Sequence, residues 1–188
     1  MKSIAYFDPN AESSLGISGK VTFTEVSKRI TKVRVELSGL APGEHGIHLH
    51  ESGDLSVGCK GACSHYNPRN TAHGSRTNPE SPRHAGDLCN NVLADKFGNV
   101  DYTYEDDILT VNPTLGRAVV VHKWPDDLGF GGYSKLTYPE VSRLCKQRGY
   151  RVIPRTRSAL VDKLNSESKK TGNAGQRIAC AVVGRMKC

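Results

Sequence analysis

The stretch His45-Gly-Ile-His-Leu-His-Glu-Ser-Gly-Asp54 contains the point at which the hydrophobic pattern of the chain changes. Before it, apolar and polar residues alternate in short runs bounded by Gly, Pro or Asn, at residues 4–7, 21–24 and 33–37. This alternation is typical of antiparallel strands joined by short turns. It continues through residues 46–50, so His48 and His50 leave the same face of a strand and could bind one metal ion. For this pair alone, two polar residues facing water is an equally good interpretation.

The alternation stops after His50, and residues 51–86 are rich in Gly, Pro, Asn, Ser and His. A loop of this length in a compact domain needs something other than an apolar core to hold it. Three imidazoles and one carboxylate, a ligand set that tetrahedral zinc accepts in a closed structural site, come from His65, His73, His84 and Asp87. We therefore expect a metal ion to order this loop.

Strand patterns return after the loop, at residues 91–94, 100–104, 118–122 and 177–183, with a turn at 96–99. About eight strands with one long, histidine-bearing loop predict an all-β sandwich or barrel. His122 ends a strand that contains three valines, where a histidine without a partner would be unusual. With His48, His50 and a fourth histidine it would suit copper, because imidazole tolerates both oxidation states of that metal.

Residues 134–165 break the β pattern. Thr137 and Thr156 are predicted helix N-caps, Gly149 fits the end of the first helix, and the residues from 150 to 154 are predicted to be extended. The segment carries eight cations and two anions, a net charge of +6, out of +7 for the whole chain. We expect one domain, residues 1–188, interrupted by this small, basic helical insertion.

Length and composition limit the remaining choices. The chain has 188 residues, enough for one domain with a full core. It has no apolar run of the roughly 18 residues that a membrane span needs, and MKSIAYFDPN at the start is not an apolar leader, so we expect a cytoplasmic protein without a membrane partner. Six cysteines are too few for a disulfide scaffold, which leaves room for a single bridge whose partners cannot be found by counting.

Six segments, taken in chain order, resemble the signature segments of copper,zinc superoxide dismutases: HGIHLHESGD, CSHYNP, AHGS, RHAGDL, GRAVVVHKWPDDLGFGG and KKTGNAGQRIAC. The resemblance covers essentially residues 1–133 and 166–188. It implies an eight-stranded Greek-key β-barrel and an enzyme that dismutates superoxide with copper and zinc ions. In that family, Cu(II) takes an electron from one superoxide and releases dioxygen, and Cu(I) then reduces a second superoxide to hydrogen peroxide.

The same resemblance assigns the metal ligands. The copper ligands would be His48, His50, His65 and His122. The zinc ligands would be His65, His73, His84 and Asp87. His65 is thus shared between the metals, and in the family it leaves copper and takes up a proton when copper is reduced. The spacing from His73 to His84 is about two residues longer than usual, which loop closure tolerates.

Other positions take supporting roles by resemblance. Asp126 matches the carboxylate that joins a copper histidine to a zinc histidine, and Arg177 matches the guanidinium that attracts and orients superoxide at the mouth of the copper channel. Without the resemblance, a surface turn and a solvated strand edge would be the simpler interpretations of these two residues. Lys170 either steers substrate or faces water, and His45 matches a structural position with no chemistry.

The cysteines also acquire roles. Cys59 and Cys180 match the disulfide that ties the long loop to the last strand, a bond that is exceptional in reducing compartments. Cys63 lies four residues from Cys59 and is a competing partner for Cys180. The remaining thiols, Cys89, Cys145 and Cys188, are expected only to pack.

The insertion resembles the SAP-type helix–extended–helix motif, which supports a DNA-binding surface, and this match is short and degenerate. It predicts weak, salt-dependent binding of DNA phosphates. The cations that would contact DNA are Arg143, Lys146, Arg148, Arg151, Arg155, Arg157 and Lys163. The alternative is a basic lid that raises the concentration of superoxide near copper.

Two questions stay open at this level. A non-catalytic metal-binding homologue, or a decoy that docks a copper chaperone, would share the same fold, although the complete ligand set and Arg177 argue against it. A homodimer is expected from the family, with a copper chaperone as another partner. However, Ser52 and Arg185 occupy two positions that are usually apolar at the subunit contact, where buried polar groups would cost stability.

Overall fold

The computed structural model describes residues 1–78, 82–150 and 155–187. Most of this chain is a β-barrel. The strands are β1 (Lys2–Phe7), β2 (Ser18–Glu25), β3 (Thr31–Ser38), β4 (Gly43–His50), β5 (Ser56–Cys59), β6 (Asn90–Ala94), β7 (Val100–Asp106), β8 (Ala118–His122) and β9 (Arg177–Arg185). Eight of them form one sheet in the order β6-β4-β8-β9-β1-β2-β3-β7, and β5 lies outside it. The predicted strands and the turn between β6 and β7 are confirmed.

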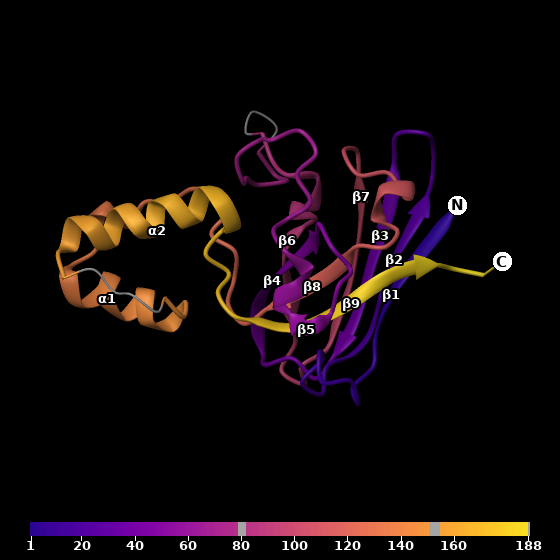
Figure 1. Cartoon of the computed structure of the whole chain (residues 1–188), viewed down its shortest axis with the longest axis horizontal. Coiled ribbons are helices and arrows are strands. Elements are labelled where there is room, and N and C mark those ends of the chain that lie inside the picture. The colour runs from indigo at the N-terminus through magenta and orange to yellow at the C-terminus, as the bar shows by residue number, and fades with distance from the viewer. Residues whose placement is uncertain (79–81, 151–154, 188) are drawn as a thin grey trace.

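The strand order is that of a Greek-key barrel. All pairings in the sheet are antiparallel, and β4 pairs with β6 and β8 rather than with its predecessor β3, which pairs with β2 and β7. The sheet curves until it forms a nearly closed barrel (Figure 1). The predicted eight-stranded Greek-key fold is therefore confirmed, and β4 and β8, which carry histidines, are neighbours within it.

Alternation in the sequence becomes the division between core and solvent. In β3 every second residue is buried, with Val33 and Val35 fully inaccessible, and β2 contributes Val21 and Phe23 to the same core. Between β6 and β7 the turn needs Gly98, whose φ is +82° and where a Cβ would lie 2.3 Å from the Leu40 carbonyl oxygen. The rigid barrel positions the loops between its strands.

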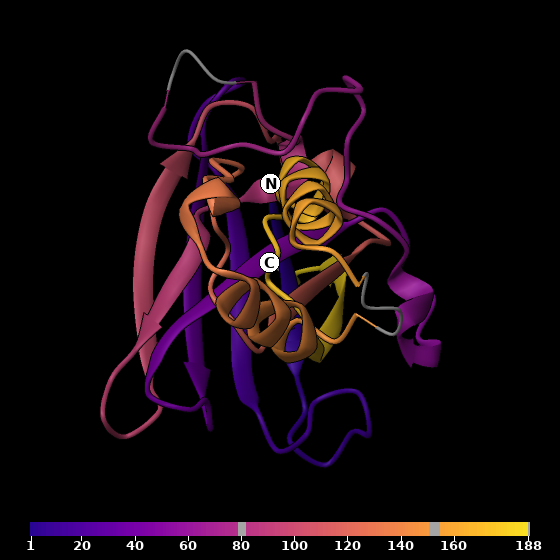
Figure 2. The ribbon, with the colours of Figure 1, turned by 90° about the vertical axis from the view of Figure 1, so that its left-hand side faces the viewer.

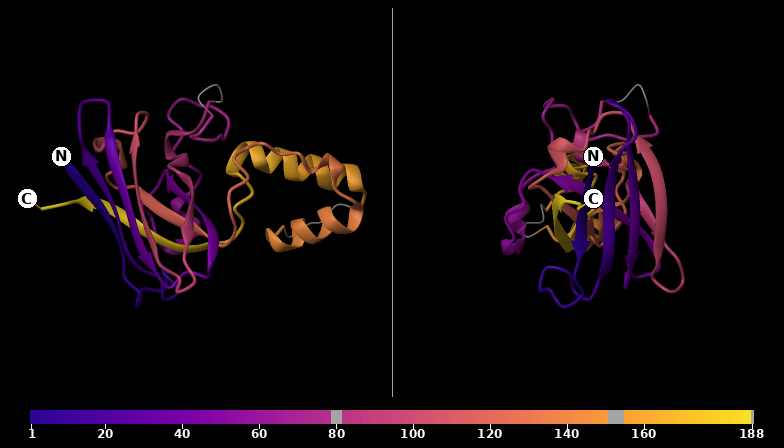
Figure 3. Two further views of the ribbon diagram at one scale, coloured as in Figure 1. Left: turned by 180° about the vertical axis from the view of Figure 1, so that it is seen from behind. Right: turned by 90° about the vertical axis from the view of Figure 1, so that its right-hand side faces the viewer.

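The insertion forms two helices, α1 (Tyr138–Gln147) and α2 (Arg157–Thr171), which we call the helical pair. Thr137 and Thr156 are their N-caps, and Gly149, with φ +78°, follows the end of α1, as predicted. The two helices project from the barrel on the side away from both chain termini (Figures 1 and 3). Figure 2 views the pair along this projection, with the barrel behind it.

The helical pair has a small core of its own, formed by Val141, Cys145, Leu160, Val161 and Leu164. α2 does not end where the sequence predicted the insertion to end: it runs through residue 165 to Thr171 without a break. Its last turn therefore belongs to a segment that resembles the barrel family, and α2 joins the two regions. The extended segment predicted at 150–154 falls mostly on residues 151–154, outside the described residues.

In the described part of the chain, no helix combines the length and the apolar character that crossing a membrane requires.

Candidate metal centre

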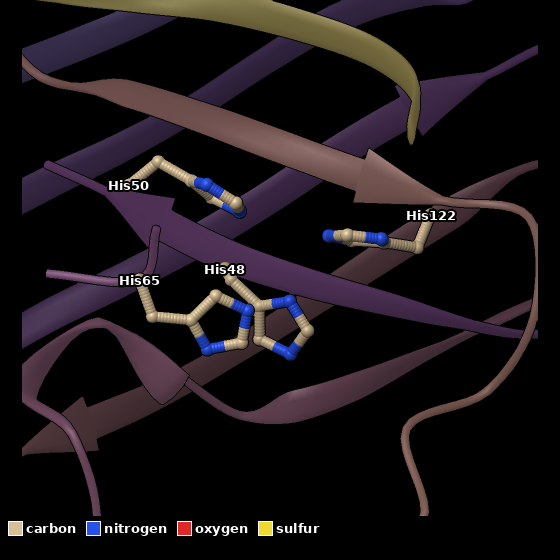
Figure 4. A group of neighbouring side chains, drawn as sticks. All are labelled: His48, His50, His65 and His122. Carbon is tan, nitrogen blue, oxygen red and sulfur yellow. The ribbon is translucent and has the colours of Figure 1, made fainter. Parts of the chain in front are cut away.

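Four histidines from two adjacent strands and one loop converge on a single point. His48 and His50 alternate along β4, and His122 ends the neighbouring β8, at a register shift between β8 and β9. His65 joins them from the long loop through an isolated β-bridge with His50. One ring nitrogen from each residue lies within 4.8 Å of the others, and Figure 4 shows the four rings around one space. The sequence predicted this grouping.

The nitrogens at the centre of this group have no hydrogen-bond partner in the described structure. They are His48 Nδ1, His50 Nε2, His65 Nε2 and His122 Nε2, and all are buried. A buried polar atom without a partner costs free energy, so four of them aimed at one point require an explanation. A metal ion that accepts four imidazole nitrogens supplies one, and the donor set fits copper.

The opposite nitrogens of three of these rings are fixed by hydrogen bonds. The carbonyl oxygens of Cys63 and Gly175 lie 2.9 Å from His50 Nδ1 and 3.1 Å from His122 Nδ1. His48 Nε2 lies 2.7 Å from a carboxylate oxygen of Asp126. Such partners set the ring orientation and the tautomer, leaving the inward nitrogens unprotonated, with lone pairs that can bind a metal.

The second group lies in the long loop and shares His65. Nδ1 atoms of His65 and His73 lie 2.9 Å from one carboxylate oxygen of Asp87, and Nδ1 of His84 lies 3.0 Å from it. The short 3-10 helix η2 (Ala85–Asp87) turns this oxygen toward the rings, while the other carboxylate oxygen accepts the His84 backbone N–H at 2.9 Å. Three imidazoles and one carboxylate fit a tetrahedral zinc ion.

Asp126 connects the two groups. Its Oδ2 lies 2.7 Å from His48 Nε2 and its Oδ1 lies 2.9 Å from His73 Nε2. The backbone of Asp126 is held by the Asn91 side chain, which donates to the Asp126 carbonyl at 2.9 Å and accepts the Asp126 N–H at 2.7 Å. The carboxylate therefore lies in the position that the sequence predicted, and Asn91 is an anchor that the sequence did not reveal.

Comparison with known proteins decides the family. The family model described as copper/zinc superoxide dismutase (SODC) matches residues 17–140, which is well over half of the chain. The chain belongs to the copper/zinc superoxide dismutase family. Its activity is the dismutation of superoxide to dioxygen and hydrogen peroxide, and its cofactors are copper and zinc ions.

Individual members of the family are similar to this chain along most of their length. This superoxide dismutase is 42% identical over 176 residues to "Superoxide dismutase [Cu-Zn]" of Paramecium bursaria Chlorella virus 1, covering 91% of this chain and 74% of the viral protein. It is 38% identical to the extracellular superoxide dismutase [Cu-Zn] of Drosophila melanogaster, covering 98% and 85%. Among solved structures it resembles the clock protein EA4, with a TM-score of 0.70, 35% identity and coverage of 97% and 93%.

In the first group of this dismutase, burial favours neutral imidazoles. Burial, with further repulsion from neighbouring rings, lowers the pKa values of His50 and His122 well below their usual range. The pKa of His65 falls to about 3 for the same reason, although Asp87 opposes the shift. Neutral imidazoles are the form that binds metal, so these rings need not lose a proton first at neutral pH.

His73 behaves differently because two carboxylates hold it. Burial lowers its pKa, but hydrogen bonds to Asp126 and Asp87 outweigh burial and raise the pKa to about 10. The pKa values of Asp87 and Asp126 are lowered despite burial, through their hydrogen bonds to the histidines. Without metal, both ring nitrogens of His73 therefore carry protons. Zinc would replace the proton at Nδ1.

Arg177 lies at the edge of the first group, beside His50, His65 and His122. Its guanidinium donates to the carbonyl oxygens of Cys59, at 2.7 Å, and Cys63, at 2.5 Å. The Cys63 carbonyl also lies 2.9 Å from His50 Nδ1, so one backbone segment positions both side chains. Burial lowers the pKa of Arg177, but a guanidinium stays charged in proteins.

The predicted disulfide is confirmed. Cys59 and Cys180 are bonded, which ties the segment that positions Arg177 to strand β9. Cys63 does not compete for Cys180 in this structure and has an exposed free thiol. Cys89 is half-buried and Cys145 is buried in the helical pair, both as free thiols, while Cys188 lies outside the described residues.

His45 and Lys170 belong to neither group. The two ring nitrogens of His45 lie 2.9 Å from the His122 carbonyl oxygen and 2.8 Å from that of Ala41, which agrees with the structural role predicted for it. Lys170 is exposed on α2, with its Nζ 3.8 Å from Glu167.

The predicted DNA-contacting cations are divided by the structure. Arg157 donates to the backbone carbonyls of Leu136 and Ser134, and Lys163 Nζ lies 4.6 Å from the centre of the Tyr150 ring. These two, with the half-buried Arg148, are engaged in the fold. The exposed members that remain are Arg143, Lys146 and Arg155, and Arg151 lies outside the described residues.

Sequence reasoning missed the contacts that join the helical pair to the metal centre. Asn173 donates to Asp127 at 2.8 Å, and Ser168 donates to the same carboxylate at 2.9 Å. The His73 N–H donates to the Lys169 carbonyl at 2.8 Å, so the last turn of α2 holds a predicted zinc ligand directly. The one sequence feature that could have indicated these contacts is Asp127, a second aspartate directly after Asp126 to which the sequence assigns no role.

Proposed function

We propose that copper is held by His48, His50, His65 and His122, and zinc by His65, His73, His84 and Asp87. The observation that carries this assignment is the set of four buried, unpaired nitrogens next to a three-imidazole, one-carboxylate group that shares His65. A metal ion at the centre of the first group would give each of those nitrogens a partner. His65 is accordingly proposed as the bridge between the metals.

When bound, copper supplies a one-electron couple that accepts an electron from one superoxide and returns it to a second. The side chains around it bind and orient the superoxide anion and supply or accept protons. Arg177 attracts the anion and orients it beside the histidines, since its guanidinium is already positioned by two carbonyls. His65 Nε2, which lacks a hydrogen-bond partner, is the atom proposed to hold and release a proton during the cycle.

Asp126 and the zinc group have a supporting role in this proposal. Asp126 keeps His48 and His73 in fixed orientations, so that the two groups cannot move independently. A zinc ion held in the second group would order the long loop and keep His65 in place. The zinc site is closed, with its ligands buried, which suits a structural metal rather than a catalytic one.

Reciprocal variants test the ligand assignment. In protein loaded with both metals, His122→Gln is expected to lose copper and dismutation while retaining zinc, because His122 belongs only to the first group. His84→Gln is expected to lose zinc first, because it belongs only to the second. Metal content by mass spectrometry and superoxide decay would be measured on the same samples. Retention of copper by His122→Gln would contradict the proposal.

A second, weaker role is DNA binding through the exposed cations of the helical pair. Arg143, Lys146 and Arg155 support it, since none of them has an ion pair among the described contacts. Deleting residues 134–165 would cut α2, so charge reversal of these three cations is the better test. Retention on DNA at low salt should be lost in the triple variant, and unchanged retention would refute this role.

The partners and the location stay predictions. Ser52 is half-buried and Arg185 exposed, and sedimentation of the metallated protein would test whether this surface forms a homodimer.

A copper chaperone is proposed only by resemblance, and copper transfer from such a protein would test it. A cytoplasmic location must be tested by fractionation, because the Drosophila relative is described as extracellular and disulfides persist mainly in oxidising compartments.

A further inference from the structure

A small cavity of about 170 Å³ opens onto the copper group. Its inner wall is formed by His50, His65 and His122, with Arg177 beside them. Its outer wall comes in part from the helical pair and its connection, through Arg148, Tyr150 and Glu167. All three lie in or next to the two helices, so the helical pair contributes directly to the entrance of the histidine site.

Arg148 is fixed against the backbone that orients a copper-group histidine. It ends α1 and is half-buried, with its guanidinium carbon 5.7 Å from the centre of the Trp124 ring. A Cβ on Gly175 would lie 3.6 Å from Arg148 Cα and Cδ, and the Gly175 carbonyl oxygen is the atom that lies 3.1 Å from His122 Nδ1. The guanidinium also donates to the Pro125 carbonyl oxygen at 3.5 Å, and the residue is part of the cavity wall instead of extending into solvent.

Tyr150 forms the neighbouring part of the wall and is also held in place. Its hydroxyl donates to the side-chain oxygen of Asn173, and Lys163 packs over its ring. Asn173 in turn donates to the Leu164 carbonyl at 2.9 Å, within the helical pair. These contacts keep the aromatic ring at the cavity and limit the space available to a bound molecule.

The net charge of the side chains around the cavity depends on Arg148. The charged side chains that line it are Arg148, Glu167 and Arg177. Glu167 and Arg177 alone would sum to zero, whereas Arg148 gives the entrance a net positive charge. A positive, partly buried entrance attracts small anions more strongly than an exposed charge does, because less solvent screens it.

We propose that Arg148 is a second anion-guiding residue of this dismutase, supplied by the helical insertion, and that Tyr150 narrows the same entrance to small anions. Arg148 would capture the anion at the outer end of the cavity and Arg177 would orient it at the inner end. The proposal rests on the function proposed above, because it requires that the copper group is where superoxide reacts.

Azide, a small monoanion that binds Cu(II), is the probe for a direct test. The full-length protein, loaded with copper and zinc, would be titrated with azide at low and physiological salt, following the copper absorption spectrum. Arg148→Gln is expected to raise the azide Kd about three- to tenfold and to weaken its salt dependence. Arg148→Lys, which keeps the charge, should stay within about twofold of the original protein.

Lys135→Gln is the matched control, because it removes the same charge from the same insertion at an exposed position that does not line the cavity. It should change azide binding by less than about twofold. An unchanged Kd and salt dependence in Arg148→Gln would overturn the proposal. So would loss of copper, or an altered copper spectrum, in both Arg148 variants, since Arg148 would then serve only the fold. If the original protein bound neither copper nor azide, the proposed function itself would fail.

Discussion

The barrel and the helical pair are stabilised by different means, although they meet at one site. The barrel has an extensive apolar core, a disulfide and two buried histidine groups that share His65. The helical pair has a five-residue core and no histidine, and its helices begin at capping threonines. We therefore expect the stability of the barrel to depend on bound metal and on pH, and that of the helical pair to depend on local packing and caps. The contacts of Asp127, Asn173 and His73 join the two regions.

The largest expected difference is in the response of the metal-free protein to acid. The folded-state pKa of His65, about 3, is below its unfolded value, so the unfolded state binds more protons between about pH 6.5 and 3. Stability should fall over that range by on the order of 5 kcal/mol. His73, with its pKa raised to about 10, adds stability that is fully present below about pH 6.5 and is lost as the pH rises toward 10.

Urea unfolding of the chelated protein at several pH values would therefore show maximum stability near pH 6.5. Amide exchange in α1 and α2 would be measured at the same pH values. Because the helical pair contains no histidine, its local stability should not change with pH, and its amides should lose protection only when the whole protein unfolds. A flat profile between pH 4 and 6.5 would contradict the assignment of neutral buried histidines.

Cys180→Ser should have the next largest effect, and on the barrel alone. The disulfide closes a segment with a sequence separation of 121, for which chain entropy predicts a loss of about 4–5 kcal/mol. The Cys59–Cys63 segment would also loosen, so Arg177 would lose its fixed position and dismutation should weaken. Thermal unfolding and superoxide decay measure both effects. Cys63→Ser is the control, because its exposed thiol should matter little.

Leu160→Ala tests whether the helical pair unfolds separately. Leu160 is fully buried in the small helical core, and its truncation should cost about 2–5 kcal/mol. Amide exchange should accelerate in α1 and α2 while barrel amides and metal content stay unchanged. The exposed substitution Ser166→Ala is the matched control on the same helix. If barrel amides lost protection equally, the two regions would form one cooperative unit.

Asp126→Asn tests the connection between the two metal groups. Because Asp126 contacts His48 in one group and His73 in the other, its replacement should weaken copper and zinc binding about 10- to 100-fold each. Competition with metal chelators measures both affinities. Weakening of only one metal would mean that Asp126 does not couple the groups.

The smallest expected effect is that of Thr137→Ala. Thr137 caps α1, and its hydroxyl, which alanine lacks, donates to the Glu140 carboxylate at 2.7 Å. Loss of the cap should destabilise α1 by about 1 kcal/mol. Amide exchange in the first turn of α1 would detect the change, and metal binding should be unaffected. An effect on the barrel would again show stronger coupling than the structure suggests.

Much of this arrangement could be predicted from local patterns. Alternation located the strands, and Thr137, Gly149 and Thr156 marked ends of the helices, because capping and strand burial depend on nearby residues. The histidine groups were predicted with the help of the family resemblance. How far the second helix runs could not be predicted: α2 continues through residue 165 to Thr171 and ends at Gly172, which lies against Asp126 and His73.

The sequence by itself determined the strands, the caps, the resemblance to the dismutases and the residues that could serve as metal ligands. Only the tertiary structure decided that Arg148 and Tyr150 lie at the cavity beside His50, His65 and His122. It also decided that Arg157 is engaged in the fold and that Asp127 anchors the helical pair through Ser168. The physical reason is the distance along the chain over which each effect acts. Periodicity and capping act over a few residues, whereas a shared cavity depends on how distant segments pack, which no local pattern encodes.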